Sequence, residues 1–284
     1  MIDSMKKKFL FFMVFLFLFL NIINGSENFE VIERRIEGNI NWTLMEFEAN
    51  GFAELDPNTT NIATNELLTL KKAEENGYSN LTTLIINMTF DSKTRIIDLI
   101  KEDSEINRNL FEFVQNAFKS DLKYIQNKRI IYFILPFLLK NTSIYSVLKL
   151  NRDYINEIEN ISIFPNSKEF TSLVIDCRGY MLNPALKPKI LNPYRQAIIT
   201  FDNVKWDVIE KKGFVNYICD ISGLKALKDL IGDNPYIIPA IGSYGINNTD
   251  VIISEESIAF FFGNPKNFEL IRNGKIILLI DKNK

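Results

Sequence analysis

Apolar and polar positions in the first half of the chain follow two different periods. Between residues 39 and 53 the apolar positions alternate loosely, which predicts a strand or a hairpin. Between residues 62 and 88 the spacing becomes helical, and Gly77 inside this stripe indicates close packing against a strand. A second helical stretch starts at residues 91–94, with an apolar stripe formed by Ile106, Leu110, Phe113, Val114, Ala117 and Phe118.

A hairpin is predicted next, with strands at residues 122–125 and 130–139. The second of these strands is apolar throughout and should be central, with Pro136 near its end. Residues 151–170 show no strong period. We therefore place a linker there, between an amino-terminal module at residues 29–150 and a carboxy-terminal module at residues 171–284.

The second module opens with a short apolar run at residues 172–176, typical of a strand covered on both faces. Ser222 and Ser254 are expected to cap helices. Further strands are predicted at residues 197–201, 215–221, 236–241, 251–253 and 276–280. Strands alternating with helices predict a mixed sheet, so the fold class is α+β, with a sheet and packed helices in each module.

The amino terminus has the features of a secretory signal at residues 1–26. Three lysines at positions 6–8 precede an apolar run at residues 9–20, and the small pair Gly25-Ser26 follows. The run is short for a membrane span, although an uncleaved anchor is the alternative. No cysteine lies near the expected cleavage region. The prediction is an exported protein without the cysteine to which a lipoprotein attaches its lipid, with membrane contact only if the signal segment is retained.

Composition excludes several classes of function. The chain of 284 residues contains no histidine, which removes Ser-His-Asp and Cys-His catalysis and histidine-ligated metals. Its net charge of −2 gives no overall field that would attract nucleic acid. We expect no metal and no cofactor.

Residues after the strand at 172–176 are the candidate binding residues. Proline residues punctuate this stretch, and a rigid surface loop after a buried strand is a common way to present side chains to a partner. The alternative is a well-fixed connection between two strands, with Asp176 and Arg178 as a local ion pair. The candidate binding residues in this stretch are Asp176, Arg178, Lys187, Lys189 and Arg195.

Two further hypotheses concern carboxylates at strand ends and a disulfide between the two cysteines. Asp176, Asp220 and Asp281 each end an apolar strand, where α/β enzymes place carboxylates, yet no glycine-rich phosphate loop accompanies them. Cys177 and Cys219 are the only cysteines, so a disulfide is chemically allowed in an exported chain, with two buried thiols as the alternative.

Short blocks in a fixed order carry a resemblance to a known family. These blocks are GNINWTLMEFEANGFA, MTFDSKTRIIDLI, LVIDCRGYMLNPALKPKIL, GDNPYIIPAIG, TDVIISEESI and GKIILLID. Over roughly residues 36–281 the chain resembles the FlgP/FlgT-like group of flagellar-associated, lipoprotein-related periplasmic proteins. Heavy use of Asn, Lys, Ile and Phe is typical of AT-rich bacterial genomes, such as those of many spirochaetes.

The resemblance implies a non-enzymatic structural protein at the flagellar motor or cell envelope. Its partners would be other periplasmic or motor proteins, and self-association into a ring is one form of this hypothesis. The alternatives are a periplasmic enzyme or small-ligand binder using the strand-end carboxylates, and a general envelope protein without a flagellar link.

Overall fold

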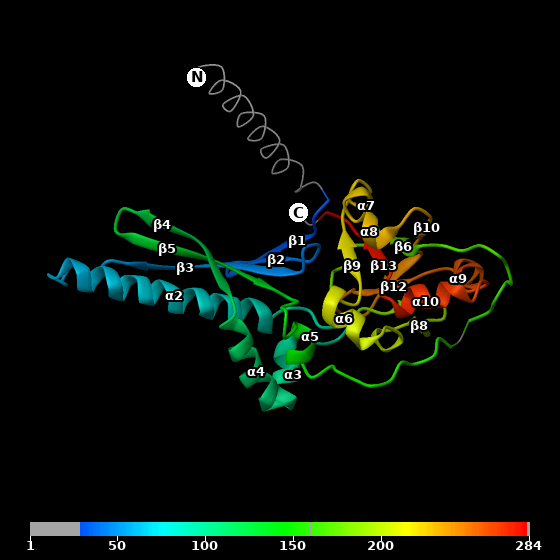
Figure 1. Cartoon of the computed structure of the whole chain (residues 1–284), viewed down its shortest axis with the longest axis horizontal. Helices are drawn as coiled ribbons and strands as arrows, with labels where there is room; N and C mark the ends of the chain where they lie inside the picture. Colours follow the sequence, from blue (N-terminus) through cyan, green and yellow to red (C-terminus); the bar gives the residue numbers. More distant parts are fainter. Residues whose placement is uncertain (1–28, 160, 283–284) are drawn as a thin grey trace, which may run out of the picture.

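The computed structural model describes residues 29–159 and 161–282 (Figure 1). The expected signal segment at residues 1–26 lies outside the described residues. The first sheet is antiparallel, with strand order β1-β2-β3-β5-β4. Its strands are β1 (Ile32–Arg34), β2 (Gly38–Asn41), β3 (Glu46–Glu54), β4 (Phe118–Ile125) and β5 (Lys128–Pro136). The strand or hairpin predicted at residues 39–53 is a hairpin, the predicted hairpin of β4 and β5 is confirmed, and Pro136 is the last residue of its strand.

The long helix α2 (Ile62–Ile86) covers one face of β3 and β5. A methyl group on Gly77 would lie 2.2 Å from the ring of Phe133, and one on Gly51 would lie 2.2 Å from the Gly77 nitrogen. The predicted close approach of helix and strand is confirmed. The expected apolar stripe is wrong at its start, because Leu67 is exposed whereas Thr69 is buried.

The second helical stretch forms α3 (Ile96–Glu102) and α4 (Ser104–Val114), followed later by the short α5 (Ile144–Val147). Four members of the predicted stripe, Ile106, Leu110, Phe113 and Val114, are buried on α4. Phe118 was wrongly included, since it opens β4 and is half-exposed. The helical period ends where the chain turns into the sheet.

Strands β3, β4 and β5 and helix α2 extend away from the rest of the molecule, to the left in Figure 1. We call these elements (residues 46–86 and 118–136) the arm. Bidentate hydrogen bonds from Arg129 to Glu66, with lengths of 2.6 and 2.7 Å, tie the hairpin of the arm to its helix. The guanidinium of Arg129 also lies over the ring of Tyr124, 4.7 Å from its centroid.

Residues 172–282, which we call the body, contain two further sheets of four strands each. The first is parallel, with order β10-β6-β13-β9, and the second is mixed, with order β11-β12-β7-β8. Strand β6 (Ser172–Asp176) is central and its first four residues are buried, as predicted. The other strands are β7 (Ile190–Leu191), β8 (Ala197–Ile199), β9 (Asn216–Ile218), β10 (Pro235–Pro239), β11 (Gly242–Tyr244), β12 (Asp250–Ile252) and β13 (Ile276–Leu279).

Six short helices complete the body. They are η1 (Phe201–Asn203), α6 (Trp206–Lys212), α7 (Gly223–Ala226), α8 (Lys228–Ile231), α9 (Glu255–Phe261) and α10 (Lys266–Arg272). Ser254 caps α9 by accepting a hydrogen bond of 3.1 Å from the Ser257 N–H, as predicted. Ser222 makes no side-chain cap, and the single helix expected after it is divided into α7 and α8.

One apolar cluster runs from the first sheet into the body. The ring of Trp42, which follows β2, packs edge-on against Phe137 at 5.8 Å and against Tyr217 of β9 at 5.7 Å. The fold class is α+β, as the sequence predicts, but the two modules share this core. No helix among residues 29–159 and 161–282 has the length and apolarity needed to cross a membrane.

Candidate functional site

The carboxyl ends of the parallel strands bring three aspartates to one edge of the body. Asp176 ends β6, Asp281 follows β13, and Asp220 follows β9. This is the edge at which open α/β sheets bind ligands. The sequence predicted that each aspartate ends a strand, and the structure shows that the three strands lie side by side in one parallel sheet.

Each of these carboxylates already has a partner within the chain. Arg178 donates from Nε and Nη2 to the two oxygens of Asp176, at 2.9 and 2.6 Å. The Gly179 N–H lies 3.0 Å from both oxygens of Asp281, and the Ser222 N–H donates to Asp220 at 2.7 Å. The carboxylates thus hold the starts of the loops that follow the strands.

Electrostatics at this edge favour the charged forms. The Arg178 hydrogen bond lowers the pKa of Asp176, and the hydrogen bonds from Ser222 lower the pKa of Asp220. Neither carboxylate has the raised pKa expected of a general acid at neutral pH. Within the described part of the chain, no group of three His, Cys, Asp or Glu side chains is placed to hold a metal ion.

The proline-rich loop after β6 lies against the first module rather than standing clear of the protein. The Lys187 N–H donates to the Phe90 carbonyl at 2.8 Å, and the Leu186 N–H donates to the Thr89 carbonyl at 3.3 Å. The buried hydroxyl of Tyr217 accepts from the Ala185 N–H at 3.1 Å and donates to the Ala185 carbonyl at 2.9 Å. Residues 185–187 therefore act as an internal connection between the modules.

A second loop completes this connection, which we call the joint (residues 89–94, 185–189, 217 and 247–250). The Asn247 side chain donates to the Asp91 carbonyl at 2.9 Å, and its N–H donates to the Ser92 carbonyl at 3.0 Å. Asp250 is 3% exposed and accepts from the Lys189 N–H at 3.0 Å. Burial raises the pKa of Asp250, although hydrogen bonds from Lys189 and Ser92 oppose this shift.

The five candidate binding residues do not form one site. Asp176 and Arg178 pair with each other, whereas the Lys187 ammonium lies 5.2 Å from the centre of the Phe201 ring. Lys189 is exposed, and Arg195 stacks over Tyr244 at 4.8 Å. Contacts of the joint hold the loop in place, and the role of these five side chains in binding a partner stays a prediction.

The two cysteines are not joined. Cys177 follows β6 and Cys219 follows β9, and β13 lies between these strands in the sheet. The Cys177 thiol donates to the Ile175 carbonyl at 3.5 Å, and the Cys219 thiol donates to the Glu30 carbonyl at 3.2 Å. Burial raises the pKa of both thiols, which keeps them protonated and unreactive.

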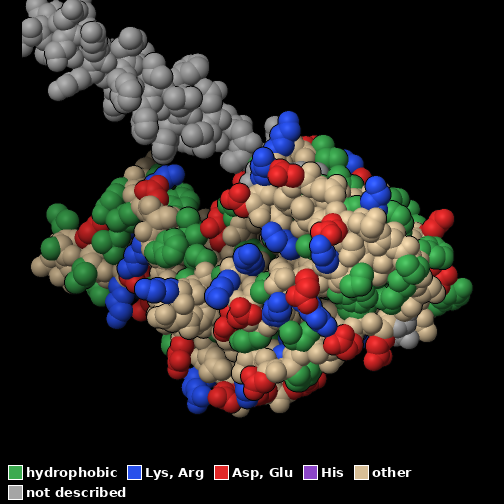
Figure 2. Space-filling model, turned by 45° about the vertical axis from the view of Figure 1, so that its right-hand side comes forward, with side chains coloured by type: hydrophobic (Ala, Val, Ile, Leu, Met, Phe, Trp, Pro, Cys, Tyr) green, Lys and Arg blue, Asp and Glu red, His purple; other side chains and the backbone are tan. Residues whose placement is uncertain are grey.

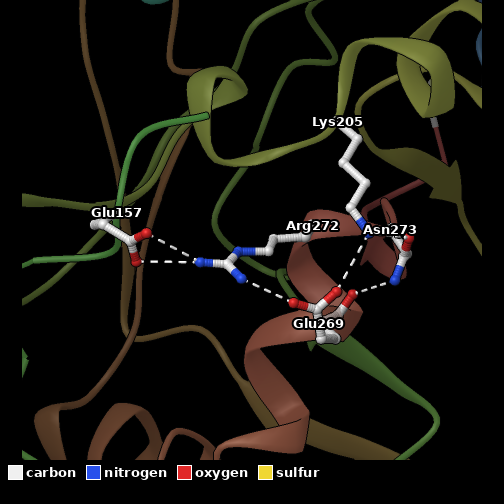
Figure 3. Close-up of polar contacts among 5 residues, drawn as sticks. All are labelled: Glu157, Lys205, Glu269, Arg272 and Asn273. Atoms are coloured by element: carbon white, nitrogen blue, oxygen red, sulfur yellow. Dashed lines mark hydrogen bonds and ion pairs between the residues drawn. The ribbon is translucent and has the colours of Figure 1, made fainter. Parts of the chain in front are cut away.

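A charged network fixes the coil between the modules to the body (Figure 3). Arg272 donates to both carboxylate oxygens of Glu157 at 3.1 Å and to Glu269 at 2.8 Å. Lys205 bridges Glu269 and Asn273, at 3.3 Å to each. Every charge in this network faces an opposite charge, so its role is to attach the coil to α10.

The arm carries a surface of a different kind. Large apolar side chains are exposed on both its sheet and its helix, namely Phe52, Ile62, Leu67, Leu68, Phe118, Leu122, Tyr124 and Ile125. Figure 2 shows apolar side chains gathered over this part of the molecule. A cavity of about 670 Å³ lies between α2 and α4 and is lined by residues that include Tyr78, Thr82 and Phe111.

The sequence prediction missed this surface, because the alternation in FKSDLKYI places Phe118, Leu122 and Tyr124 on one uncharged face, as in a strand that packs on a core. In the structure a bulge between residues 119 and 121 brings Lys119 onto the face of Leu122 and Tyr124, and every residue of the strand is exposed. Such mixing is typical of an edge strand, whereas a strand that packs on a core has one apolar face.

Comparison with known protein families gives a likeness for the body. A search of curated proteins found no match to the chain. Residues 172–282 match the family model described as Treponema pallidum Tp0624, second domain. The match starts at the first residue of β6 and ends beyond β13, so it covers the body and less than half of the chain. The body is therefore similar to a domain of a spirochaete protein family.

Proposed function

We propose that this is a non-enzymatic structural or assembly protein of the bacterial cell envelope, which acts through protein–protein contacts. The observation that carries the proposal is the arm, which extends from the body and exposes large apolar side chains. Tyr124 is 60% exposed and Leu67 is 69% exposed, on the sheet and on the helix of the arm respectively. Several large exposed apolar side chains in one part of a molecule are typical of regions that bind other proteins.

The rest of the molecule supports a scaffolding role for the body. The shared core and the joint connect the first module, which carries the arm, to the body through buried contacts, including those of Trp42 and Tyr217. A rigid connection lets the body set the position of the arm, as an assembly subunit requires.

The alternative of an enzyme or small-ligand binder has less support. The strand-end carboxylates of Asp176, Asp220 and Asp281 are hydrogen-bonded within the chain. Besides the cavity between α2 and α4, three others have volumes of about 370 to 380 Å³. None of these four cavities is lined by the three aspartates. The alternative predicts a deep pocket at these carboxylates.

Export and a flagellar role belong to the same proposal. Export rests on the signal-like residues at positions 1–26. The flagellar role rests on the short blocks that resemble the FlgP/FlgT-like group, and the similarity of the body to a Treponema domain supports a spirochaete setting. A general envelope protein of the same fold is the competing hypothesis.

The test is to image the full chain, tagged at its carboxyl terminus with a fluorescent protein that folds in the periplasm. We expect puncta at the flagellar motors that disappear when the motor is not assembled. Puncta elsewhere in the envelope would remove the flagellar part of the proposal, and a diffuse signal with unchanged motility after gene deletion would contradict the structural role.

Two matched variants separate the arm from the body. Replacing exposed Tyr124 and Leu67 of the arm by Lys should disperse the puncta. Replacing Met181 and Ile246, which are exposed on the body, by Lys adds the same charge and should leave the puncta in place. Equal effects of the two variants would contradict a specific role for the arm.

A further inference from the structure

Strand β4 forms one edge of the first sheet. It pairs with β5 on one side, and no strand among the described residues pairs with its other side. The strand is eight residues long and exposed throughout. Backbone N–H and C=O groups along such an edge can bind another strand.

The pairing with β5 assigns the side chains of β4 to two faces. Leu122 lies opposite Ile131, whose buried side chain is on the face covered by α2. Asp121 and Lys123 lie opposite Tyr132 and Ile130, on the other face, which we call the outer face. A bulge between residues 119 and 121 interrupts this alternation, so Lys119 lies on the α2 face.

We propose that β4 pairs antiparallel with β4 of a second copy of this chain, about a two-fold axis at Leu122. In this register Leu122 faces Leu122 of the second copy on the α2 face. On the outer face Asp121 of each copy lies opposite Lys123 of the other. Two opposite-charge pairs and one apolar pair then stabilise the contact.

Three neighbouring positions of the two-fold axis are less favourable than the one at Leu122. An axis at Asp121 would bring the two Asp121 side chains together, and an axis at Lys123 would do the same for the two Lys123 side chains. An axis at Ser120 would set Lys119 opposite Asp121, but the bulge holds these two side chains on different faces. Charge complementarity therefore selects the axis at Leu122 over the axes at Asp121 and Lys123, and the bulge excludes the axis at Ser120.

Charged residues on edge strands often prevent indiscriminate pairing. In β4 they have a second consequence, since the alternation of Asp121 and Lys123 is self-complementary only in the antiparallel register about Leu122. The pairing would also join the outer faces of the two sheets. Each outer face contributes exposed apolar side chains, among them Phe52 and Ile125.

This inference rests on the proposed function and makes it specific, because the partner is a second copy of the chain. Its test is disulfide crosslinking of the full chain in cells. In Leu122→Cys the two introduced thiols would be directly opposite, with Cβ atoms about 4.5–5.5 Å apart before adjustment. A mild oxidant should then give a covalent dimer on a non-reducing gel.

Tyr124→Cys is the matched control, on the same face of the same strand. In the proposed register the two Tyr124 positions are four residues apart along the strands, or about 13 Å, which is too far for a disulfide. The native Cys177 and Cys219 are buried and should not form intermolecular disulfides. Equal dimer yields from Leu122→Cys and Tyr124→Cys would overturn the register, and no dimer from Leu122→Cys would overturn the pairing.

Charge reversal tests the register independently. In the Leu122→Cys background, Asp121→Lys should lower the dimer yield roughly tenfold, because two attractive pairs become repulsive. Adding Lys123→Asp restores opposite charges and should restore the yield. Within the strand Asp121 and Lys123 form an exposed ion pair at 3.8 Å, and because such a pair adds little to stability both variants should fold. If the double reversal stayed as low as the single one, charge pairing would not select the contact.

The outcomes also separate this inference from the proposed function. Correct localisation without a Leu122→Cys crosslink would reject the pairing of β4 and leave the structural role in place. A crosslink in cells where the tagged protein is diffuse would support the pairing and count against the localisation.

Discussion

At the scale of single residues, Gly51 and Gly77 set the distance between α2 and the sheet of the arm. A methyl group on Gly51 would lie 2.0 Å from the Ala73 carbonyl oxygen, which is backbone. One on Gly77 would meet the buried ring of Phe133. Close approach of helix and strand at this point therefore requires glycine at both positions.

Gly77→Ala should destabilise the protein by about 1–3 kcal/mol, despite a gain in helix propensity of about 1 kcal/mol. Gly51→Ala should cost more, because its methyl group meets backbone atoms that cannot rotate away. Urea denaturation of both variants measures these effects. Ser79→Ala on the exposed side of α2 is the control and should change stability by less than about 0.5 kcal/mol.

Asp250 makes the stability of the joint depend on pH. Because burial raises its pKa in the folded state, folding favours the protonated form. Its contribution to stability is therefore greatest below the ordinary pKa of 3.8 and is lost as the pH rises through the raised value. An uncharged side chain of the same shape would keep its contribution to stability as the pH rises.

Asp250→Asn should increase the free energy of unfolding at pH 7 and have little effect at pH 3, because only the charged form of Asp250 is disfavoured by burial. Denaturation at a series of pH values compares the variant with the natural chain. Asp207→Asn, at an exposed position on α6, is the control and should show no such pH-dependent difference. A loss of stability at neutral pH in Asp250→Asn would contradict the assignment.

At the scale of elements, β9 and the loop after β6 depend on one hydroxyl group. Tyr217 of β9 both donates to and accepts from the backbone of Ala185, and all these groups are buried. Removing the hydroxyl leaves a buried N–H and a buried carbonyl without that partner. Each such group costs about 1–3 kcal/mol.

Tyr217→Phe should therefore destabilise the protein by roughly 2–4 kcal/mol and speed hydrogen exchange at Ala185. Chemical denaturation and amide exchange provide the two measurements. Tyr194→Phe changes an exposed tyrosine in the turn between β7 and β8 and should leave both unchanged. Unaltered exchange at Ala185 in Tyr217→Phe would show that the loop is held by its other contacts.

At the scale of the whole molecule, the shared core couples the two modules. Trp42 packs against Phe137 of the first module and Tyr217 of the body, and the Thr43 hydroxyl donates to the Tyr217 carbonyl at 2.7 Å. Since these contacts are buried, unfolding of one module exposes apolar surface of the other. The molecule should behave as one cooperative unit.

Scanning calorimetry of the natural chain should thus show a single transition. Trp42→Ala should lower stability by about 3–5 kcal/mol and divide the transition into two, because it removes the largest side chain between the modules. Leu67→Ala, at an exposed position of the arm, should leave one transition. Two transitions in the natural chain would show that the modules unfold independently.

Local elements could be predicted from the sequence because a buried face imposes a period on its own segment. Residues 172–176, the hairpin at β4 and β5, and the capped helix after Ser254 were found in this way. The strand-end position of Asp176, Asp220 and Asp281 also followed from apolar runs alone. Ser222 shows the limit, because a Ser before a helical pattern does not determine whether its hydroxyl or a neighbouring carboxylate binds the backbone.

The sequence by itself determined the α+β class, most strands and helices, and the absence of histidine chemistry. Only the tertiary structure decided that the loop after β6 binds the Thr89–Phe90 backbone, that Cys177 and Cys219 stay apart, and that β4 is an exposed edge. The physical reason is the range of the interactions. A period along the chain records whether each residue is buried, whereas the choice of partner depends on segments that meet only when the chain folds.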